Sequence, residues 1–61
     1  MAVVTANGKE THVTIPCTVE GFLQQLELPP RSVVVELNGE ALTPSSFDGK
    51  QLQSGDRLEI V

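Results

Sequence analysis

The stretch that decides the fold is TVEGFLQQLELPP, residues 18–30. Its apolar residues recur at i, i+3, i+4 and i+7, which is the spacing of one helix face; they are Val19, Phe22, Leu23 and Leu26. Thr18 is a suitable N-cap, and Pro29 and Pro30 end the helix because proline lacks a backbone N–H and clashes with the preceding turn. The stretch therefore predicts one helix over Val19–Leu28, with its apolar face turned toward a core.

The residues before this helix predict a β-hairpin. Met1–Ala6 is apolar and rich in β-branched residues, and Thr11–Ile15 alternates apolar and polar side chains. Between them, Asn7-Gly8 is a strong hairpin signal because both residues tolerate the positive φ of a tight turn. In the second strand we expect Val13 and Ile15 to share the buried face.

The residues after the helix predict three short strands separated by turns. Their expected ranges are Ser32–Leu37, Glu40–Leu42 and Arg57–Val61. Asn38-Gly39 is a second hairpin turn, residues 44–49 have room for a single helical or 3-10 turn, and Ser54–Asp56 is another tight turn. The predicted core consists of Val19, Phe22, Leu23, Leu26, Val33, Val35, Leu58 and Ile60.

The element order β-β-α-β-β-β predicts an α+β fold in one domain over residues 1–61. One helix with a single apolar stripe can cover only one sheet, so the helix should pack on one face of it. The connection through the helix is long enough for a crossover, which makes the sheet mixed. We therefore expect a β-grasp (ubiquitin-like) fold, with four or five strands and the first and last strands parallel and adjacent in the middle.

Composition excludes several classes of function. The formal net charge of −4 and the lack of Tyr and Trp argue against nucleic-acid binding, which needs positive charge and stacking side chains. No apolar run approaches the ~20 residues of a membrane span, and no signal peptide follows Met1. Cys17 is the only cysteine, which favours a reducing compartment. We expect a cytoplasmic monomer when free.

Two residues are candidate catalytic groups, Cys17 and His12. Cys17 lies just before the helix N-cap, where a helix dipole can favour the thiolate. No further residue is placed by the sequence to orient His12, and one His with one Cys is too few ligands for a metal. A packed cysteine and a surface histidine are the simpler interpretation. We expect no enzyme activity, no cofactor and no metal.

Four segments together resemble the ThiS sulfur-carrier family. They are VTANGK (residues 4–9), TVEGFLQQL (18–26), VVVELNGE (33–40) and LQSGDRLEIV (52–61). The first matches the family's opening strand and turn, and the second its helix. The third matches its third strand with the turn that follows, and the last matches the Gly-Asp turn and final strand. Each motif is common alone, but their order covers nearly the whole chain.

The resemblance implies a sulfur carrier for the thiazole ring of thiamine. Such carriers end in Gly-Gly, whose carboxylate is adenylated by an E1-like adenylyltransferase and converted to a thiocarboxylate; a thiazole synthase then receives the sulfur. The present sequence stops at Val61 without Gly-Gly. Three explanations stay open: a missing tail, a homologue that has lost the carrier chemistry, and a piece of a fusion to a partner enzyme.

Two other functions stay open at this stage. One is a β-grasp binding module without covalent chemistry, and the other is a sulfur carrier for another pathway, such as molybdenum-cofactor synthesis. For a sulfur carrier of either pathway, strand alternation places a candidate partner interface on the sheet face opposite the helix. Its residues are Val34, Glu36, Arg57, Glu59 and Val61. Glu36 and Glu59 are expected to face outward from neighbouring strands, which is more typical of a solvated face than of an acid–base pair.

Overall fold

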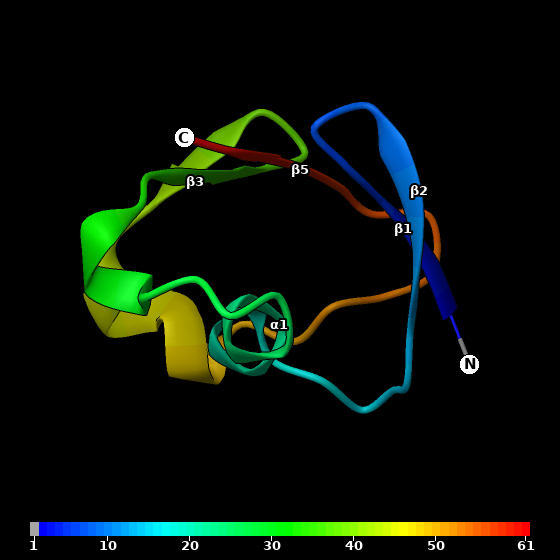
Figure 1. The fold of residues 1–61 in the computed structure, drawn as a ribbon, viewed down its shortest axis with the longest axis horizontal. Coiled ribbons are helices and arrows are strands. Elements are labelled where there is room, and N and C mark those ends of the chain that lie inside the picture. Colours follow the sequence, from blue (N-terminus) through cyan, green and yellow to red (C-terminus); the bar gives the residue numbers. More distant parts are fainter. Residues whose placement is uncertain (1) are drawn as a thin grey trace.

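In the described part of the chain, five strands and one α-helix form two layers, with the helix lying against one face of the sheet (Figure 1). The structure, a computed structural model, describes residues 2–61. In chain order the elements are β1 (Ala2–Ala6), β2 (Lys9–Val13), α1 (Val19–Gln25), the 3-10 helix η1 (Pro30–Ser32), β3 (Val35–Leu37), β4 (Glu40–Leu42), the 3-10 helix η2 (Pro44–Gly49) and β5 (Arg57–Ile60). The predicted order of strands and helix is confirmed, and the 3-10 turn expected at residues 44–49 is present.

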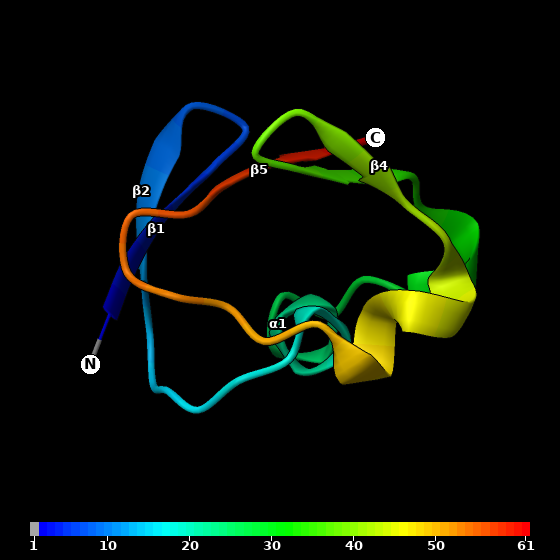
Figure 2. The ribbon, with the colours of Figure 1, turned by 180° about the vertical axis from the view of Figure 1, so that it is seen from behind.

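The sheet has the strand order β2-β1-β5-β3-β4. β1 and β5 run parallel, with Thr5 opposite Arg57 and Ala6 opposite Leu58. The other neighbouring strands are antiparallel. Figure 2 shows β5 passing between the two hairpins. The first and last strands are therefore adjacent in the middle of a mixed sheet, and the β-grasp prediction is confirmed.

Both predicted Asn-Gly turns form. Asn7 and Gly8 have φ of 52° and 81°, and Asn38 and Gly39 have φ of 53° and 85°. Positive φ at both central residues defines the tight hairpin turn whose twist matches the flanking strands. Each turn therefore fixes the register of its hairpin without a longer loop.

Because the first turn is tight, β2 begins and ends two residues earlier than predicted. Ala6 pairs directly with Lys9, and the pairing continues to Ala2 opposite Val13, so β2 spans Lys9–Val13. The expected strand Thr11–Ile15 is therefore wrong in its bounds. Ile15 lies two residues after the end of β2 and is 41% exposed, so its predicted place beside Val13 on the buried face is also wrong.

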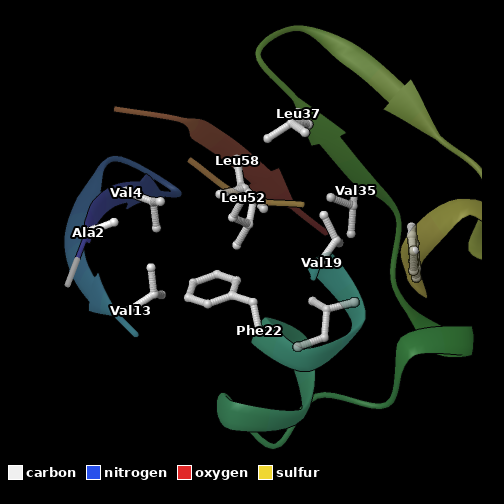
Figure 3. Close-up of a cluster of buried hydrophobic side chains, with 11 residues drawn as sticks. Ala2, Val4, Val13, Val19, Phe22, Val35, Leu37, Leu52 and Leu58 are labelled. Carbon is white, nitrogen blue, oxygen red and sulfur yellow. The ribbon is translucent and has the colours of Figure 1, made fainter. Parts of the chain in front are cut away.

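The core lies between α1 and the sheet. Figure 3 shows Phe22 pointing from α1 toward the β1–β2 hairpin, where Val4 and Val13 lie. The buried residues are Ala2, Val4, Val13, Val19, Phe22, Leu23, Val35, Leu37, Phe47, Leu52 and Leu58. Five of the eight predicted core residues are among them; Val33 and Ile60 are partly buried and pack against the core. Phe47 and Leu52 reach the core from η2 and the segment after it, where irregular structure hides any apolar period.

The helix ends earlier than predicted, at Gln25. Glu27 adopts φ of +61°, Leu28 N–H donates to the Leu23 carbonyl at 2.9 Å, and Glu27 N–H donates to the Gln24 carbonyl at 3.0 Å. These two bonds form the Schellman motif that closes many helices, here with glutamate in the position that glycine usually takes. The chain reverses before a third helical turn can form. Leu26 is therefore 38% exposed, and its predicted place in the core is wrong.

Strand β3 begins at Val35, three residues later than predicted. Pro29 and Pro30 lead into the 3-10 helix η1 at Pro30–Ser32, which uses residues expected in the strand. Val34 nevertheless exchanges two backbone hydrogen bonds with Val61, each 2.9 Å long. Within residues 2–61, no helix is long and apolar enough to cross a membrane.

Candidate functional site

The outer face of the sheet carries the five residues predicted to bind a partner. Val34 is 61% exposed and Val61 is 88% exposed. Glu36, Arg57 and Glu59 are also exposed, while Leu58 between the last two is buried. These residues therefore lie on the side away from α1, where strand alternation placed them. That a partner binds there remains a prediction.

Cross-strand pairing brings four of these residues together. The register of β3 with β5 sets Glu36 opposite Glu59, and Val34 is bonded to Val61 two pairs further on. We call these four residues the Val–Glu patch. Arg57 lies at the other end of β5, where its backbone meets Asn38. The patch therefore combines an exposed apolar pair at the chain end with an acidic pair behind it.

The two carboxylates of the patch do not make a metal centre. Among residues 2–61 no group of three or more His, Cys, Asp and Glu side chains lies close enough to hold a metal ion. Like charges placed directly opposite each other in a sheet are unfavourable. Glu36 and Glu59 therefore form an acidic surface that a cationic side chain of a partner would complement.

Asn7 and Asn38 have a role that the sequence analysis did not assign. Asn7 Nδ2 donates to the Ile60 carbonyl at 3.0 Å, and Ile60 N–H donates to Asn7 Oδ1 at 2.7 Å. Asn38 Oδ1 accepts from Arg57 N–H at 2.9 Å, and its Nδ2 donates to Asp56 Oδ1 at 3.1 Å. Both turn residues therefore hold β5, one near each end. The sequence does contain a signal for this role, because asparagine carries both a hydrogen-bond donor and an acceptor on a short side chain.

Cys17 and His12 lie in ordinary structural surroundings. Cys17 is half-buried beside the core, and its thiol donates to the Thr18 carbonyl at 3.3 Å. His12 is exposed on the edge strand β2, opposite Val3. Thr18 Oγ1 accepts from Gly21 N–H at 3.0 Å, which confirms Thr18 as the N-cap.

A groove of about 610 Å³ lies next to the chain end on the helix side of the sheet. Its lining includes Leu26, Leu28, Val33 and Ile60, together with residues of the β1–β2 hairpin from Ala6 to His12. The groove exists because α1 has only seven residues, about 10 Å of helix at 1.5 Å per residue, and leaves this end of the sheet uncovered. The sequence did not predict it, because a helix running to Leu28 would have filled this space.

The fold and the site define a class: a β-grasp domain whose last strand, in the middle of the sheet, delivers the chain end to the surface. Comparison with known proteins gives the family. The family model described as "ThiS family" matches residues 3–61, and the chain belongs to this family.

Solved structures agree with the family. The crystal structure of thiamine biosynthesis protein ThiS from Geobacter metallireducens superposes with a TM-score of 0.84 at 34% identity, covering 97% of this chain and 90% of that one. An NMR structure of a thiamine biosynthesis protein from the same organism gives a TM-score of 0.80 at 34% identity, covering 97% of this chain and 80% of that one.

A curated relative is much longer. A thiazole synthase from Paramagnetospirillum magneticum is 40% identical over 55 residues, which are 90% of this chain and 17% of the relative. The chain thus spans about a sixth of the length of that relative. The predicted resemblance to the ThiS family is confirmed by the family model and the solved structures.

Proposed function

We propose that this domain carries sulfur for thiazole formation in thiamine biosynthesis, through a thiocarboxylate on a C-terminal Gly-Gly. The 61 residues contain no Gly-Gly pair, so the proposal requires a tail after Val61. An adenylating enzyme would activate the terminal carboxylate with ATP, and a sulfur donor would then replace the AMP. The observation that carries the proposal is the position of β5: it is the central strand of the sheet, and a tail would continue directly from it.

Glycine suits such a tail because it has no Cβ and can pass through a narrow active site. An extended tail reaches about 3.3 Å further per residue. Two glycines after Val61 would therefore bring the carboxylate about 7 Å beyond the folded body. The body itself would supply recognition and the tail would supply the reacting group.

An E1-like adenylyltransferase must hold the body while the tail enters its nucleotide site. The Val–Glu patch supports this role, because it lies directly beside the chain end. Val34 and Val61 form an exposed apolar pair, with Glu36 and Glu59 as a charged margin. Interfaces commonly combine an apolar centre with a polar rim. Arg57 extends the charged margin at the start of β5.

A thiazole synthase is the proposed acceptor of the sulfur. Support comes from the relative of that name, in which a segment similar to this domain occupies 17% of one longer chain. Carrier and acceptor activities that occur in one polypeptide are expected to act in succession. The alternative pathway, molybdenum-cofactor synthesis, has no such observation in its favour.

The first experiment is ATP–pyrophosphate exchange by the E1-like adenylyltransferase of the source organism. Two forms of the domain are compared, one ending at Val61 and one extended by Gly-Gly. We expect exchange with the extended form alone, and a thiocarboxylate by mass spectrometry once a sulfur donor is added. Exchange with the form ending at Val61 would contradict the proposal. Binding of both forms without exchange would instead support a non-covalent binding module.

The second experiment tests the Val–Glu patch with Val34→Asp in the extended form. We expect weaker binding to the adenylyltransferase by about tenfold or more, because a charge replaces an apolar contact at the centre of the interface. Ile15→Asp is the matched control: Ile15 is 41% exposed and belongs to the segment between β2 and α1, on the far side of α1 from the C-terminus (Figure 1). Normal binding by a folded Val34→Asp variant would show that the partner uses another face.

A further inference from the structure

The backbone of β5 bonds alternately to its two neighbours. On the β3 side, Asn38 N–H donates to the Arg57 carbonyl at 2.7 Å, and Val34 and Val61 exchange two bonds of 2.9 Å. On the β1 side, Asn7 N–H donates to the Leu58 carbonyl at 2.9 Å. Alternation gives the next residue on that side, Ile60, an N–H and a carbonyl that also need partners.

β1 cannot supply these partners. It ends at Ala6, and the chain reverses at Asn7-Gly8. The paired register of β1 with β5 accordingly stops at Ala6 opposite Leu58. An ordinary parallel ladder would leave the backbone of Ile60 without a partner on this side of the sheet.

The Asn7 side chain takes the place of the missing peptide group. The carboxamide of asparagine has a carbonyl oxygen that accepts hydrogen bonds and an NH₂ group that donates them. It therefore offers the same kinds of group as a backbone peptide unit, which has a C=O acceptor and an N–H donor. Its oxygen accepts from Ile60 N–H at 2.7 Å and its nitrogen donates to the Ile60 carbonyl at 3.0 Å. Both bonds span 53 positions of the sequence and join the first turn to the chain end. The Asn7 side chain thus acts as one more residue of β1.

We infer that Asn7 is a positioning residue, which holds the end of β5 so that the following tail leaves the sheet in one direction. This inference rests on the proposed carrier function and adds a residue to it. Without the Asn7 amide, the segment after Leu58 would be held on one side only, by its bonds to β3, and the backbone N–H and carbonyl of Ile60 would lose their partners. A reacting group reacts faster when the segment that carries it is already ordered, because less entropy is lost on reaching the reactive geometry. Asn7 would supply this order at the last residues before the tail.

Asn38 offers a matched control at the other end of the same strand. Asn7 and Asn38 both have positive φ, of 52° and 53°, and both precede a glycine with positive φ. Each side chain makes two hydrogen bonds, in both cases one of them with the backbone N–H of a β5 residue. Asn7→Gly and Asn38→Gly both keep the turn, since glycine adopts positive φ freely. Only Asn7→Gly should remove the bonds that hold Ile60 on the β1 side.

The test combines hydrogen exchange with steady-state kinetics on the Gly-Gly form of the domain. In Asn7→Gly we expect the Ile60 amide to exchange about tenfold faster, relative to the loss of global stability, because one hydrogen-bond acceptor is removed locally. We expect kcat for ATP-dependent adenylation to fall about three- to tenfold, with KM for the domain nearly unchanged, because the docking surface is intact. Asn38→Gly should leave kcat close to that of the unsubstituted domain.

A second variant, Asn7→Asp, keeps the acceptor for Ile60 N–H but turns a carboxylate oxygen toward the Ile60 carbonyl. Asn7→Asp should also lower kcat. Because aspartate does not add the backbone flexibility of glycine, this result would show that the loss in Asn7→Gly does not come from that flexibility. Equal losses of kcat in Asn7→Gly and Asn38→Gly would overturn the inference, since they would indicate a stability effect alone. Unchanged kcat in Asn7→Gly with faster Ile60 exchange would also overturn it. Failure of the unsubstituted Gly-Gly form to be adenylated would overturn the proposed function and the role of Asn7 in it. An unchanged Ile60 exchange rate in Asn7→Gly would overturn the positioning role of Asn7 alone.

Discussion

Leu23 and Leu26 test how far the helix serves the core. Both are leucines on the same apolar stripe, but Leu23 is fully buried and Leu26 is 38% exposed. Leu23→Ala should lower the free energy of unfolding by about 2.7–5 kcal/mol, because it removes buried methyl groups and leaves a cavity. Leu26→Ala removes the same atoms at a site open to solvent. At about 0.8 kcal/mol per buried methylene, three carbons at three-fifths burial give a loss of about 1.5 kcal/mol.

The measurement is urea unfolding followed by far-ultraviolet circular dichroism, because the chain has no Trp or Tyr for fluorescence. A domain of 61 residues has a total stability of about 3–9 kcal/mol, so Leu23→Ala is expected to be marginally folded or unfolded at 25 °C. Added sulfate, which strengthens apolar burial, allows both variants to be compared while folded. Equal losses for the two leucines would refute the early end of the helix and restore the longer one that the sequence predicted.

Three further changes each test one local feature. Gly21→Ala should stabilise the domain by about 0.5–1 kcal/mol, because a Cβ there would meet Thr18 Oγ1 at 3.4 Å, an ordinary contact, and a glycine in the helix would be removed; a lower urea midpoint would contradict it. Glu27→Gly should stabilise by a similar amount, about 0.5–1 kcal/mol, because glycine adopts the φ of +61° without strain; an unchanged midpoint would show that the glutamate is not strained. Cys17→Ala should leave sulfur transfer by the Gly-Gly form intact, and its loss in a folded variant would show that the thiol takes part.

The parts of the fold that the sequence predicted are those set by local signals. Two Asn-Gly turns fixed two hairpins, and the spacing of apolar residues located α1. Several predicted bounds differ from the structure, because the ends of strands and helices depend on partners distant in the chain. β2 pairs with β1 over Lys9–Val13, and the alternation that continues to Ile15 does not indicate where this pairing stops. Leu26 likewise fits the helical stripe and is excluded only because Glu27 reverses the chain.

The candidate site was predicted unevenly for the same reason. Val34, Glu36, Glu59 and Val61 follow from strand alternation, and the structure places all four on the outer face. Their cross-strand neighbours depend on the register of β3 with β5, which alternation alone does not fix. The groove beside Leu26 depends on the early end of α1 and could not be predicted from a stripe that continues past it.

The two asparagines explain how a four-residue strand can serve as the centre of the sheet. A central strand needs hydrogen-bond partners on both sides, yet both neighbours of β5 turn away at an Asn-Gly pair. An Asp-Gly or Gly-Gly pair would make equally good turns, but neither supplies a side chain with both a donor and an acceptor. Asn7 uses both on Ile60, and Asn38 uses one on Arg57 and one on Asp56. The residue that makes each turn thus also completes the strand beside it, and this strand leads to the chain end.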